Sequence, residues 1–374
     1  MLLKEIIDFK NGKKKPSSEG SIPIYGGNGV LGYTDQNNQD GESLIIGRVG
    51  AYCGCVYSHY GKCWISDNAI VGKVKEGNDF YYCYYLLKRL NLNSRHVGSG
   101  QPLMTQEILN NIEINICDYE TQRKIGKILK NIDDKINLNN EINNNLHELA
   151  QLELENDLEE NTTKYVMEDL FYQITPGTNY QPARVEFGIP FLNVKNINNG
   201  YIDFKDSKYI TEADYTKVHK TWQPEENDLL ISRIGTLGLV AVIRKEDLPL
   251  AVHYNFLDLK TNLIPFEFGY FLLKSNYFQT KYKFNIKNSV QEYVTVDDIR
   301  KIEVDIPSSD MMEKYKAYYN KILNIQRENR CLEQLRDTLL PKLMNGELDL
   351  DNIDIWSYKL WFVLIRRILW NWKS

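Results

Sequence analysis

Residue patterns that would support catalysis are missing from this sequence of 374 residues. It contains no G-x-x-x-x-G-K-S/T run for nucleotide phosphates, no H-E-x-x-H for zinc and no G-x-S-x-G for acyl transfer. The Asn/Asp-Pro-Pro-Tyr/Phe run of base amino-methylation is missing too. The five histidines are isolated, and the six cysteines lack paired C-x-x-C spacing, so structural roles are favoured over catalysis or a zinc site. The sequence therefore predicts no catalytic residue and no metal, which leaves recognition of a ligand.

The residues that could recognise a ligand are those that suit duplex DNA. Lysines that could contact phosphates lie beside Asn11-Gly12 and in an aromatic-rich, acid-free stretch from Lys274 to Lys287; the candidates are Lys10, Lys13, Lys14, Lys15, Lys281, Lys283 and Lys287. Side chains able to read base edges are Arg48, Arg95, Gln101, Asn179, Arg184, Asn193, Asn196, Arg233, Asn288 and Gln291. Arg48 and Arg233 lie inside strand-like motifs and could equally be structural, and the lysines could be a solvated surface.

Two similar regions must position these side chains. Residues 1–117 are rich in Gly, Tyr, Ile and Val, with turn signals every few residues, which favours short strands. Residues 165–306 repeat this style. We expect helices at 79–92 and 105–111 in the first region, and a strand pair at 228–243 with helices at 266–277 and 296–301 in the second.

Four short matches in the same order indicate a tandem duplication. Ile46-Gly-Arg48-Val-Gly50 resembles Ile231-Ser-Arg233-Ile-Gly235, and Tyr84-Tyr-Leu-Leu-Lys88 resembles Tyr270-Phe-Leu-Leu-Lys274. Ser99-Gly-Gln101 then matches Ser289-Val-Gln291, and Lys127-Ile-Leu129 matches Lys321-Ile-Leu323. Each match is weak alone, but their nearly constant offset predicts two copies of a mostly β domain followed by a long helix.

Each copy ends in a coiled-coil pattern. Between about residues 118 and 155, apolar residues recur at alternating gaps of four and three, and the seam positions Asn139 and Asn143 are polar. A second seam runs from about 310 to 345, contains Asn329, is interrupted at Arg336, and meets Pro341 where the helix should kink or end. Two matched amphipathic helices can pack on each other, and a pseudo-twofold relation between the copies makes that packing antiparallel.

The charge distribution separates the helical segment from the domains. The whole chain carries a net charge of -5, and residues 118–160, with five basic and eleven acidic residues, account for this deficit. The domains are therefore about neutral and can carry basic patches. Residues 352–374 mix tryptophans with basic residues; we expect them to pack on this protein or a partner, to form an interfacial helix or to be an unselected extension.

The chain resembles the specificity (S) subunits of type I restriction–modification systems over about residues 1–350. The resemblance is carried by Ile6-Ile-Asp-Phe-Lys-Asn-Gly12, Leu170-Phe-Tyr-Gln-Ile-Thr-Pro-Gly-Thr178, Ile22-Pro-Ile24, Ile189-Pro-Phe191-Leu-Asn-Val194 and Gly98-Ser-Gly-Gln-Pro-Leu103. The most specific match is Leu339-Leu-Pro-Lys-Leu-Met-Asn-Gly346, which is close to the usual end of the distal helical region. The chain departs from the pattern beyond Gly346.

This resemblance implies an α+β fold with two mostly β target-recognition domains separated by two long helices, packed as an antiparallel coiled coil. The implied segments are domain 1 at 1–117, the central helix and linker at 118–160, domain 2 at 161–307, the distal helix at 308–346 and a tail at 347–374. Each domain would read half of a bipartite DNA site, while the helices set the spacing and dock two methyltransferase subunits. Motor–nuclease subunits would complete the complex.

The resemblance also implies that S-adenosylmethionine, ATP and Mg²⁺ belong to the partner subunits, and the chain is expected to be a cytoplasmic, non-catalytic subunit. Three alternatives stay open. The chain could be a coiled-coil scaffold for protein partners, or the specificity part of another multisubunit restriction–methylation enzyme. A self-sufficient methylase–nuclease is disfavoured because the methylation motif is missing.

Overall fold

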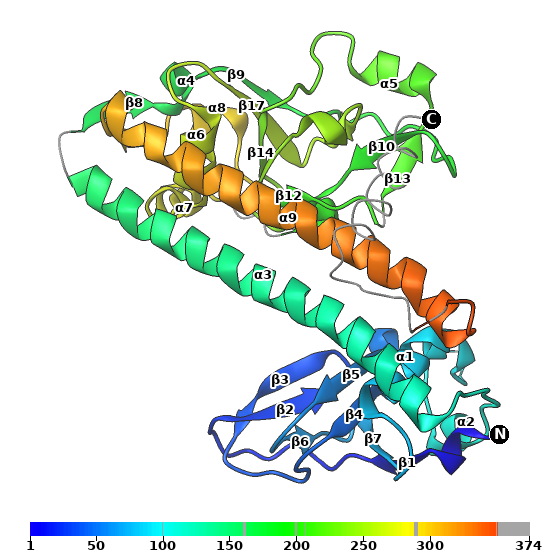
Figure 1. Ribbon diagram of the computed structural model, residues 1–374. Coiled ribbons are helices and arrows are strands. Elements are labelled where there is room, and N and C mark those ends of the chain that lie inside the picture. Colours follow the sequence, from blue (N-terminus) through cyan, green and yellow to red (C-terminus); the bar gives the residue numbers. More distant parts are fainter. Residues whose placement is uncertain are drawn as a thin grey trace. The chain divides into compact units, whose positions relative to one another are not determined.

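The computed structural model describes residues 1–98, 100–159, 162–198, 200–205, 207–287, 291–348 and 350. Within these, the chain forms two compact units (Figure 1). Unit 1 contains residues 1–139 and the described residues from Arg327 onward, and unit 2 contains residues 140–326. The predicted tail at 352–374 and the candidate Asn288 lie outside the described residues, as do Ser99 and Ser289 of the sequence repeat.

Unit 1 is built on two small sheets. The larger sheet is antiparallel, in the order β1 (Ile7–Asn11), β7 (Ala69–Val74), β4 (Ser43–Gly47) and β5 (Val56–His59). The smaller has the order β3 (Gly29–Thr34), β2 (Ile22–Gly26) and β6 (Trp64–Ile65), with β2 and β6 parallel. Ile45, Ile65 and Val71 share one apolar cluster, because alternate residues of a strand face opposite sides of its sheet.

The helices of unit 1 cover the other face of the larger sheet. They are η1 (Leu3–Glu5), η2 (Gly50–Tyr52), α1 (Phe80–Arg89), η3 (Leu92–Arg95) and α2 (Gln106–Asn110). Asp79 caps α1 by accepting a hydrogen bond from the backbone N–H of Tyr82, and α1 buries Tyr82, Tyr85 and Leu87 against the sheet. The predicted helix at 79–92 therefore exists, but it ends at Arg89, and Leu92 begins the separate 3₁₀ turn η3.

Unit 2 repeats this plan with additions. Its main antiparallel sheet has the order β15 (Val240–Val242), β14 (Leu229–Ser232), β17 (Phe256–Thr261) and β9 (Phe171–Pro176). A second sheet has the order β13 (Lys208–Ile210), β10 (Ile189–Leu192) and β16 (Ala251–Val252), and two further pairs join β11 (Ile197–Asn198) to β12 (Tyr201–Ile202) and β18 (Glu303–Ile306) to β8 (Thr163–Val166). Strands β9, β14 and β17 correspond in order and pairing to β1, β4 and β7, which confirms the predicted duplication.

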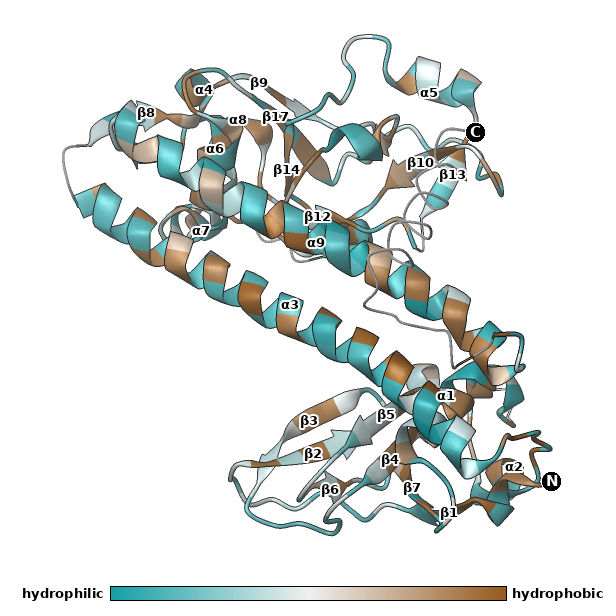
Figure 2. Ribbon diagram, viewed as in Figure 1, coloured by the Kyte–Doolittle hydropathy of each residue, from teal (hydrophilic) through white to brown (hydrophobic). Residues whose placement is uncertain are grey.

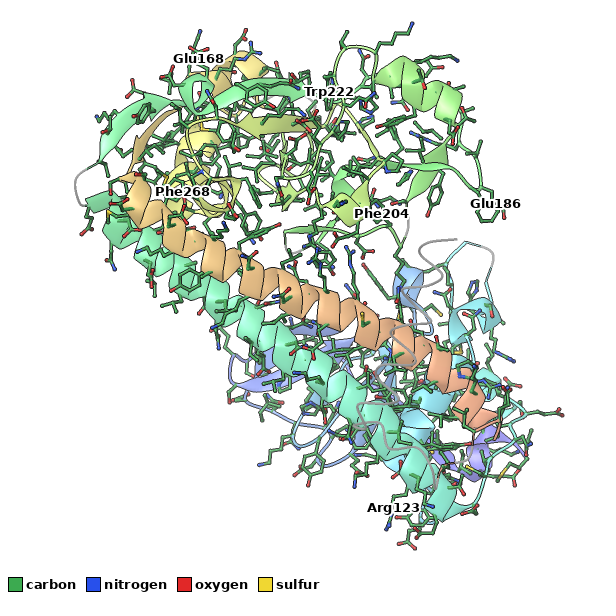
Figure 3. All side chains as sticks on the ribbon, turned by 45° about the horizontal axis from the view of Figure 1, so that its top comes forward. Arg123, Glu168, Glu186, Phe204, Trp222 and Phe268 are labelled. Atoms are coloured by element: carbon green, nitrogen blue, oxygen red, sulfur yellow. The ribbon has the colours of Figure 1, made fainter. Side chains whose placement is uncertain are left out.

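The helices of unit 2 include several that were not expected. They are α4 (Met167–Leu170), η4 (Val194–Asn196), α5 (Glu212–Val218), η5 (Lys245–Asp247), α6 (Phe266–Lys274), α7 (Asn276–Phe284) and α8 (Val296–Arg300). The single helix predicted at 266–277 is wrong at its end. Ser275 adopts an extended backbone (φ -65, ψ 148) and accepts a hydrogen bond from the N–H of Phe278, so it ends α6 and begins α7. Phe268 of α6 lies in the core of this unit (Figure 3).

Two long helices are shared by the units: α3 (Tyr119–Glu159) and α9 (Ser309–Met344). In unit 1, Arg336 pairs with Asp133 at 2.8 Å, and Asn139 donates to Asn329 at 2.8 Å. In unit 2, Tyr318 donates to Glu153 and Tyr315 to Asp157, both at 2.6 Å. Partner numbers fall along α9 as they rise along α3, so the predicted antiparallel packing is confirmed within each unit.

Hydropathy follows the predicted seams. Figure 2 shows apolar residues recurring along α3 and α9 between hydrophilic ones. Ile125, Leu129 and Ile132 of α3 are buried in the core of unit 1. At the predicted interruption of the seam, Arg336 forms an ion pair with Asp133, and the neighbouring Leu335 is buried. Pro341 lies inside α9, and the helix ends three residues later at Met344. An end near this proline was predicted, because proline has no backbone N–H to donate to the preceding turn.

Two further features of the described residues complete the fold. No helix is long and apolar enough to cross a membrane. All six cysteines are free thiols, three of them buried, and no group of three or more His, Cys, Asp or Glu side chains in the described part of the chain could hold a metal ion.

Candidate nucleic-acid interface

The sequence repeat around Arg48 and Gln101 is brought together in unit 1 where strand β4 ends. The N–H of Met104 donates to the carbonyl of Arg48 at 2.8 Å, and the N–H of Gly50 donates to the carbonyl of Pro102 at 3.0 Å. Val97 and Leu103 exchange two backbone hydrogen bonds at 2.9 and 3.0 Å and close the loop that carries Gln101. We call this arrangement the strand-end junction of unit 1. Gln101 is exposed in this loop, and Arg48 is half-buried.

Unit 2 contains the same junction in its own residues. The N–H of Val294 donates to the carbonyl of Arg233 at 3.0 Å, and the N–H of Gly235 donates to that of Glu292 at 3.4 Å. Lys287 and Tyr293 exchange backbone hydrogen bonds at 2.9 and 3.3 Å, as Val97 and Leu103 do in unit 1. The two loops are therefore built by the same backbone contacts, and the second carries Gln291 at the position of Gln101.

Each arginine of the junction is bound to a turn between two strands. Arg48 donates from its backbone N–H to the carbonyl of Asn68 (2.9 Å) and from its guanidinium to that of Asp67 (3.2 Å). Arg233 donates correspondingly to Asn255 (2.7 Å) and Tyr254 (3.4 Å), and its Nε also donates to Val294 (3.0 Å). Burial lowers the pKa of Arg233, although the group stays charged. The structural role left open by the sequence thus exists at both sites.

In each unit, the glycine that directly follows β1 or β9 lies close to the turn that the arginine binds. A Cβ on Gly12 would lie 1.9 Å from the carbonyl oxygen of Ser66, and one on Gly177 would lie 2.4 Å from that of His253. Any other residue would therefore push the strand and the turn apart. These glycines were recognised in the sequence only as parts of the opening motifs; their contacts join residues far apart in the chain.

The lysines predicted to contact phosphate differ between the units. Lys10, Lys13, Lys14 and Lys15 are all exposed, and Lys13 forms a β-bridge with Ser66, so this group lies beside the junction of unit 1. In unit 2, Lys283 is exposed, whereas Lys287 pairs with Asp298 at 2.7 Å. Lys281 donates to the Tyr277 hydroxyl at 2.7 Å and to the carbonyl of Glu303 at 2.8 Å, so it stabilises α7 against β18.

The remaining candidates lie in loops outside the junctions. Asn179 and Arg184 are exposed between β9 and β10, and the Arg184 guanidinium lies 4.2 Å from the ring centre of Phe191. Glu186, labelled in Figure 3, marks this loop. Arg95 is exposed in η3 and donates from Nε to the carbonyl of Leu90 at 3.0 Å. These three side chains keep donors available to a ligand.

Two asparagines hold their own loop. Asn193 is exposed and accepts a hydrogen bond from the N–H of Val194 at 2.8 Å. Asn196 is only 2% exposed; it donates to the carbonyl of Asp203 and the hydroxyl of Ser207 and accepts from the N–H of Asn193. With its donors and acceptor engaged, Asn196 has a structural role here, and reading a base would require this loop to open.

Comparison with known proteins agrees with the duplicated fold. The model of the type I restriction modification DNA specificity domain family matches residues 1–148 and 169–333, one match for each copy of the repeat. The chain belongs to this family. The EcoprrI specificity subunit of Escherichia coli is 34% identical over 115 residues, which cover 31% of this chain and 29% of that protein. The match thus spans less than a third of that relative.

More distant relatives match over greater lengths. The MjaIX specificity subunit of Methanocaldococcus jannaschii is 22% identical over 329 residues, covering 75% of this chain and 71% of that protein. The crystal structure of a type I restriction–modification S subunit from M. genitalium has a TM-score of 0.58 at 19% identity and covers 92% of this chain and 95% of that one. This last likeness concerns the fold.

Proposed function

We propose that this chain is the non-catalytic DNA-specificity subunit of a type I restriction–modification complex and that each unit reads one half of a bipartite DNA site. The observation that carries the proposal is the strand-end junction, which occurs once in each unit with the same backbone contacts. Two similar readers in one chain suit a ligand with two parts, and duplex DNA offers two half-sites separated by untouched base pairs.

Within each unit we assign base reading to the loop that the junction closes and to exposed side chains near it. Gln101 and Gln291 have the amide geometry that pairs with adenine in the major groove, and Arg184 can donate to guanine or phosphate. Lys10, Lys13, Lys14, Lys15 and Lys283 are exposed and would position the duplex through its phosphates. Arg48 and Arg233 would act by holding the loop in place.

The partners follow from the same proposal. Two modification subunits would dock on α3 and α9, and motor–nuclease subunits would complete the restriction complex. S-adenosylmethionine, ATP and Mg²⁺ would bind those partners. Support comes from the names of the relatives, which are specificity subunits of type I restriction enzymes.

The proposal is tested by mapping methylated sites, by sequencing, in cells that carry this chain with its modification subunits. We expect one bipartite site. Gln101→Ala should relax or change one half-site and Gln291→Ala the other, with about 1–3 kcal/mol of discrimination lost at the affected base. The exposed Gln36→Ala, far from the junction in sequence, serves as the matched control. If the purified complex binds no duplex even at low salt, DNA recognition is wrong and a protein scaffold is favoured.

A further inference from the structure

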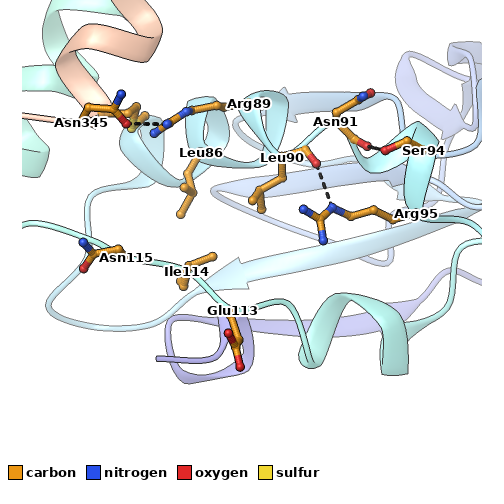
Figure 4. Close-up of a pocket in the computed structure, with 11 residues that line it drawn as sticks. Leu86, Arg89, Leu90, Asn91, Ser94, Arg95, Glu113, Ile114, Asn115 and Asn345 are labelled. Carbon is orange, nitrogen blue, oxygen red and sulfur yellow. Dashed lines mark hydrogen bonds between the residues drawn. The ribbon is translucent and has the colours of Figure 1, made fainter.

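Unit 1 contains a pocket that the proposed DNA function does not use. Its volume is about 720 Å³, and it lies between the end of α1, the turn η3 and the segment Glu113–Asn115 (Figure 4). The half-buried Leu90 supplies apolar surface, with the edges of the buried Leu86 and Ile114, and the guanidinium groups of Arg89 and Arg95 stand beside it. This size is within the range of sites that hold small molecules or a few side chains.

The internal duplication shows what fills the corresponding space in unit 2. Helix α6 corresponds to α1, and Glu303–Asp305 corresponds to Glu113–Asn115, because α8 and α2 precede them at the same offset. In unit 2 this space holds α7. The Tyr277 hydroxyl accepts from the N–H of Asp305 at 2.8 Å and donates to its carboxylate at 2.7 Å.

The pocket of unit 1 exists because its chain is shorter at this point. Four residues of η3 stand where unit 2 has the nine residues of α7. Asn115 takes the place of Asp305, and no hydrogen bond from its backbone N–H is formed within the described residues. A group that unit 2 satisfies with its own helix is therefore left for an external acceptor.

The charge around this space differs between the two units. In unit 2 the wall is acidic, at Glu303 and Asp305, and the filling helix supplies the cation of Lys281. In unit 1 the two arginines outnumber the single acidic residue of the lining. Arg95 donates only from its Nε, to the carbonyl of Leu90. Arg89 donates to the amide oxygen of Asn345. Neither guanidinium has a carboxylate partner in the described part of the chain. Glu113 also lines the pocket, but its side chain points away from Arg95 in Figure 4.

We propose that this pocket is a docking site for an acidic, amphipathic segment of a protein partner. Carboxylates of the segment pair with Arg89 and Arg95, and its apolar side chains cover Leu86, Leu90 and Ile114, as α7 covers the equivalent strand in unit 2. Forked guanidinium groups bind carboxylates through two parallel hydrogen bonds, which gives such a contact both strength and orientation. The site belongs to unit 1 alone and does not depend on whether the chain reads DNA.

The test uses the full chain and a fluorescein-labelled model helix with Glu and Leu on one face. Fluorescence anisotropy at low salt should show saturable binding, and R89Q/R95Q should weaken it at least tenfold. Asn115→Asp gives the wall of unit 1 the carboxylate that unit 2 has at Asp305, and this change should also weaken binding of the acidic helix. Arg123→Gln, an exposed arginine of α3 paired with Glu120, should leave binding unchanged. Circular dichroism checks that each variant is folded.

Three results would overturn the proposal. The first is that a matched helix with Lys in place of Glu binds equally well. The second is that R89Q/R95Q binds the acidic helix as tightly as the wild-type chain does. The third is that a short random DNA duplex displaces the acidic helix from the wild-type chain. The last would assign the two arginines to DNA phosphate. The methylation map of R89Q/R95Q separates this site from the proposed function, because loss of peptide binding with an unchanged DNA site leaves the reading function intact.

Discussion

At the scale of single residues, the most unusual group is a buried acid cluster in unit 2. Asp258 is 0% exposed, and neither of its carboxylate oxygens accepts a hydrogen bond from a donor in the described residues. Lys260 lies 3.1 Å from Asp228 and 2.8 Å from Glu225. Burial raises the pKa of Asp258 well above its usual range, and the nearby Asp228 raises it further. Unit 1 has Val71 at the place of Asp258 and keeps the lysine as Lys73.

This cluster makes a prediction about pH. Because the folded-state pKa of Asp258 is raised, its contribution to stability is full below the unfolded pKa and is lost as pH rises through the folded value. Asp258→Val, which copies unit 1, should therefore stabilise unit 2 by about 1–3 kcal/mol at pH 8, and this gain should shrink as pH falls toward 4. Calorimetric unfolding of the full chain across this pH range measures the effect. A gain that is the same at every pH would assign it to packing rather than ionisation.

At the scale of elements, the long helices combine an apolar seam with buried polar pairs. Asn139 donates to Asn329 at 2.8 Å in the interior of the helix pair, and it also donates to Glu328. Such a pair lowers stability relative to leucines but fixes the register of two helices, because shifting one helix separates the amides. In unit 2, the hydroxyl of Tyr315 and the ammonium of Lys314 both donate to the buried carboxylate of Asp157.

The asparagine pair can be tested by a double-mutant cycle. Asn139→Leu alone removes one partner of Asn329 and should cost about 1–3 kcal/mol of unfolding free energy. N139L/N329L should recover that loss, and thermal unfolding followed by circular dichroism measures both. A cycle without coupling, in which the two single losses simply add, would mean that the amides do not act as a pair.

At the scale of the whole molecule, duplication explains both the fold and the proposed use. Each unit has its own sheet, its own junction and its own part of the helix pair, with α3 and α9 contributing to both units. The same duplication allows differences, since unit 2 has α7 in the space where unit 1 has the arginine-lined pocket. Comparing the two units therefore distinguishes contacts that the fold requires from contacts that belong to one unit.

The proposed spacing role of the helices predicts the effect of lengthening them. Inserting seven residues at facing points of α3 and α9 keeps the seam and adds about 10 Å to each helix, or about three base pairs. Methylation mapping should then show a longer gap between unchanged half-sites. Insertion into α3 alone shifts the register of its contacts with α9 and should destabilise the chain instead. An unchanged gap after the paired insertion would exclude the helices as the ruler.

Much of the fold was predictable because it depends on local periodicity and on repetition. The seam of α3, the antiparallel helix pair and the two copies of a mostly β domain followed by a long helix are written in apolar spacing and matched motifs, and the structure confirms them. The end of α6 was not predicted, because the apolar pattern continues past Lys274 while one serine caps a new helix.

For the candidate site, the sequence by itself determined which residue types were available and that they occur twice. It paired Arg48 with Arg233 and Gln101 with Gln291. Only the tertiary structure decided their roles, because a side chain's role depends on what lies beside it. Arg48 donates to Asp67 and Asn196 is buried by its own loop, and neither contact has a periodic signal. The pocket beside Arg95 likewise appears only when a four-residue turn stands where its twin has a helix.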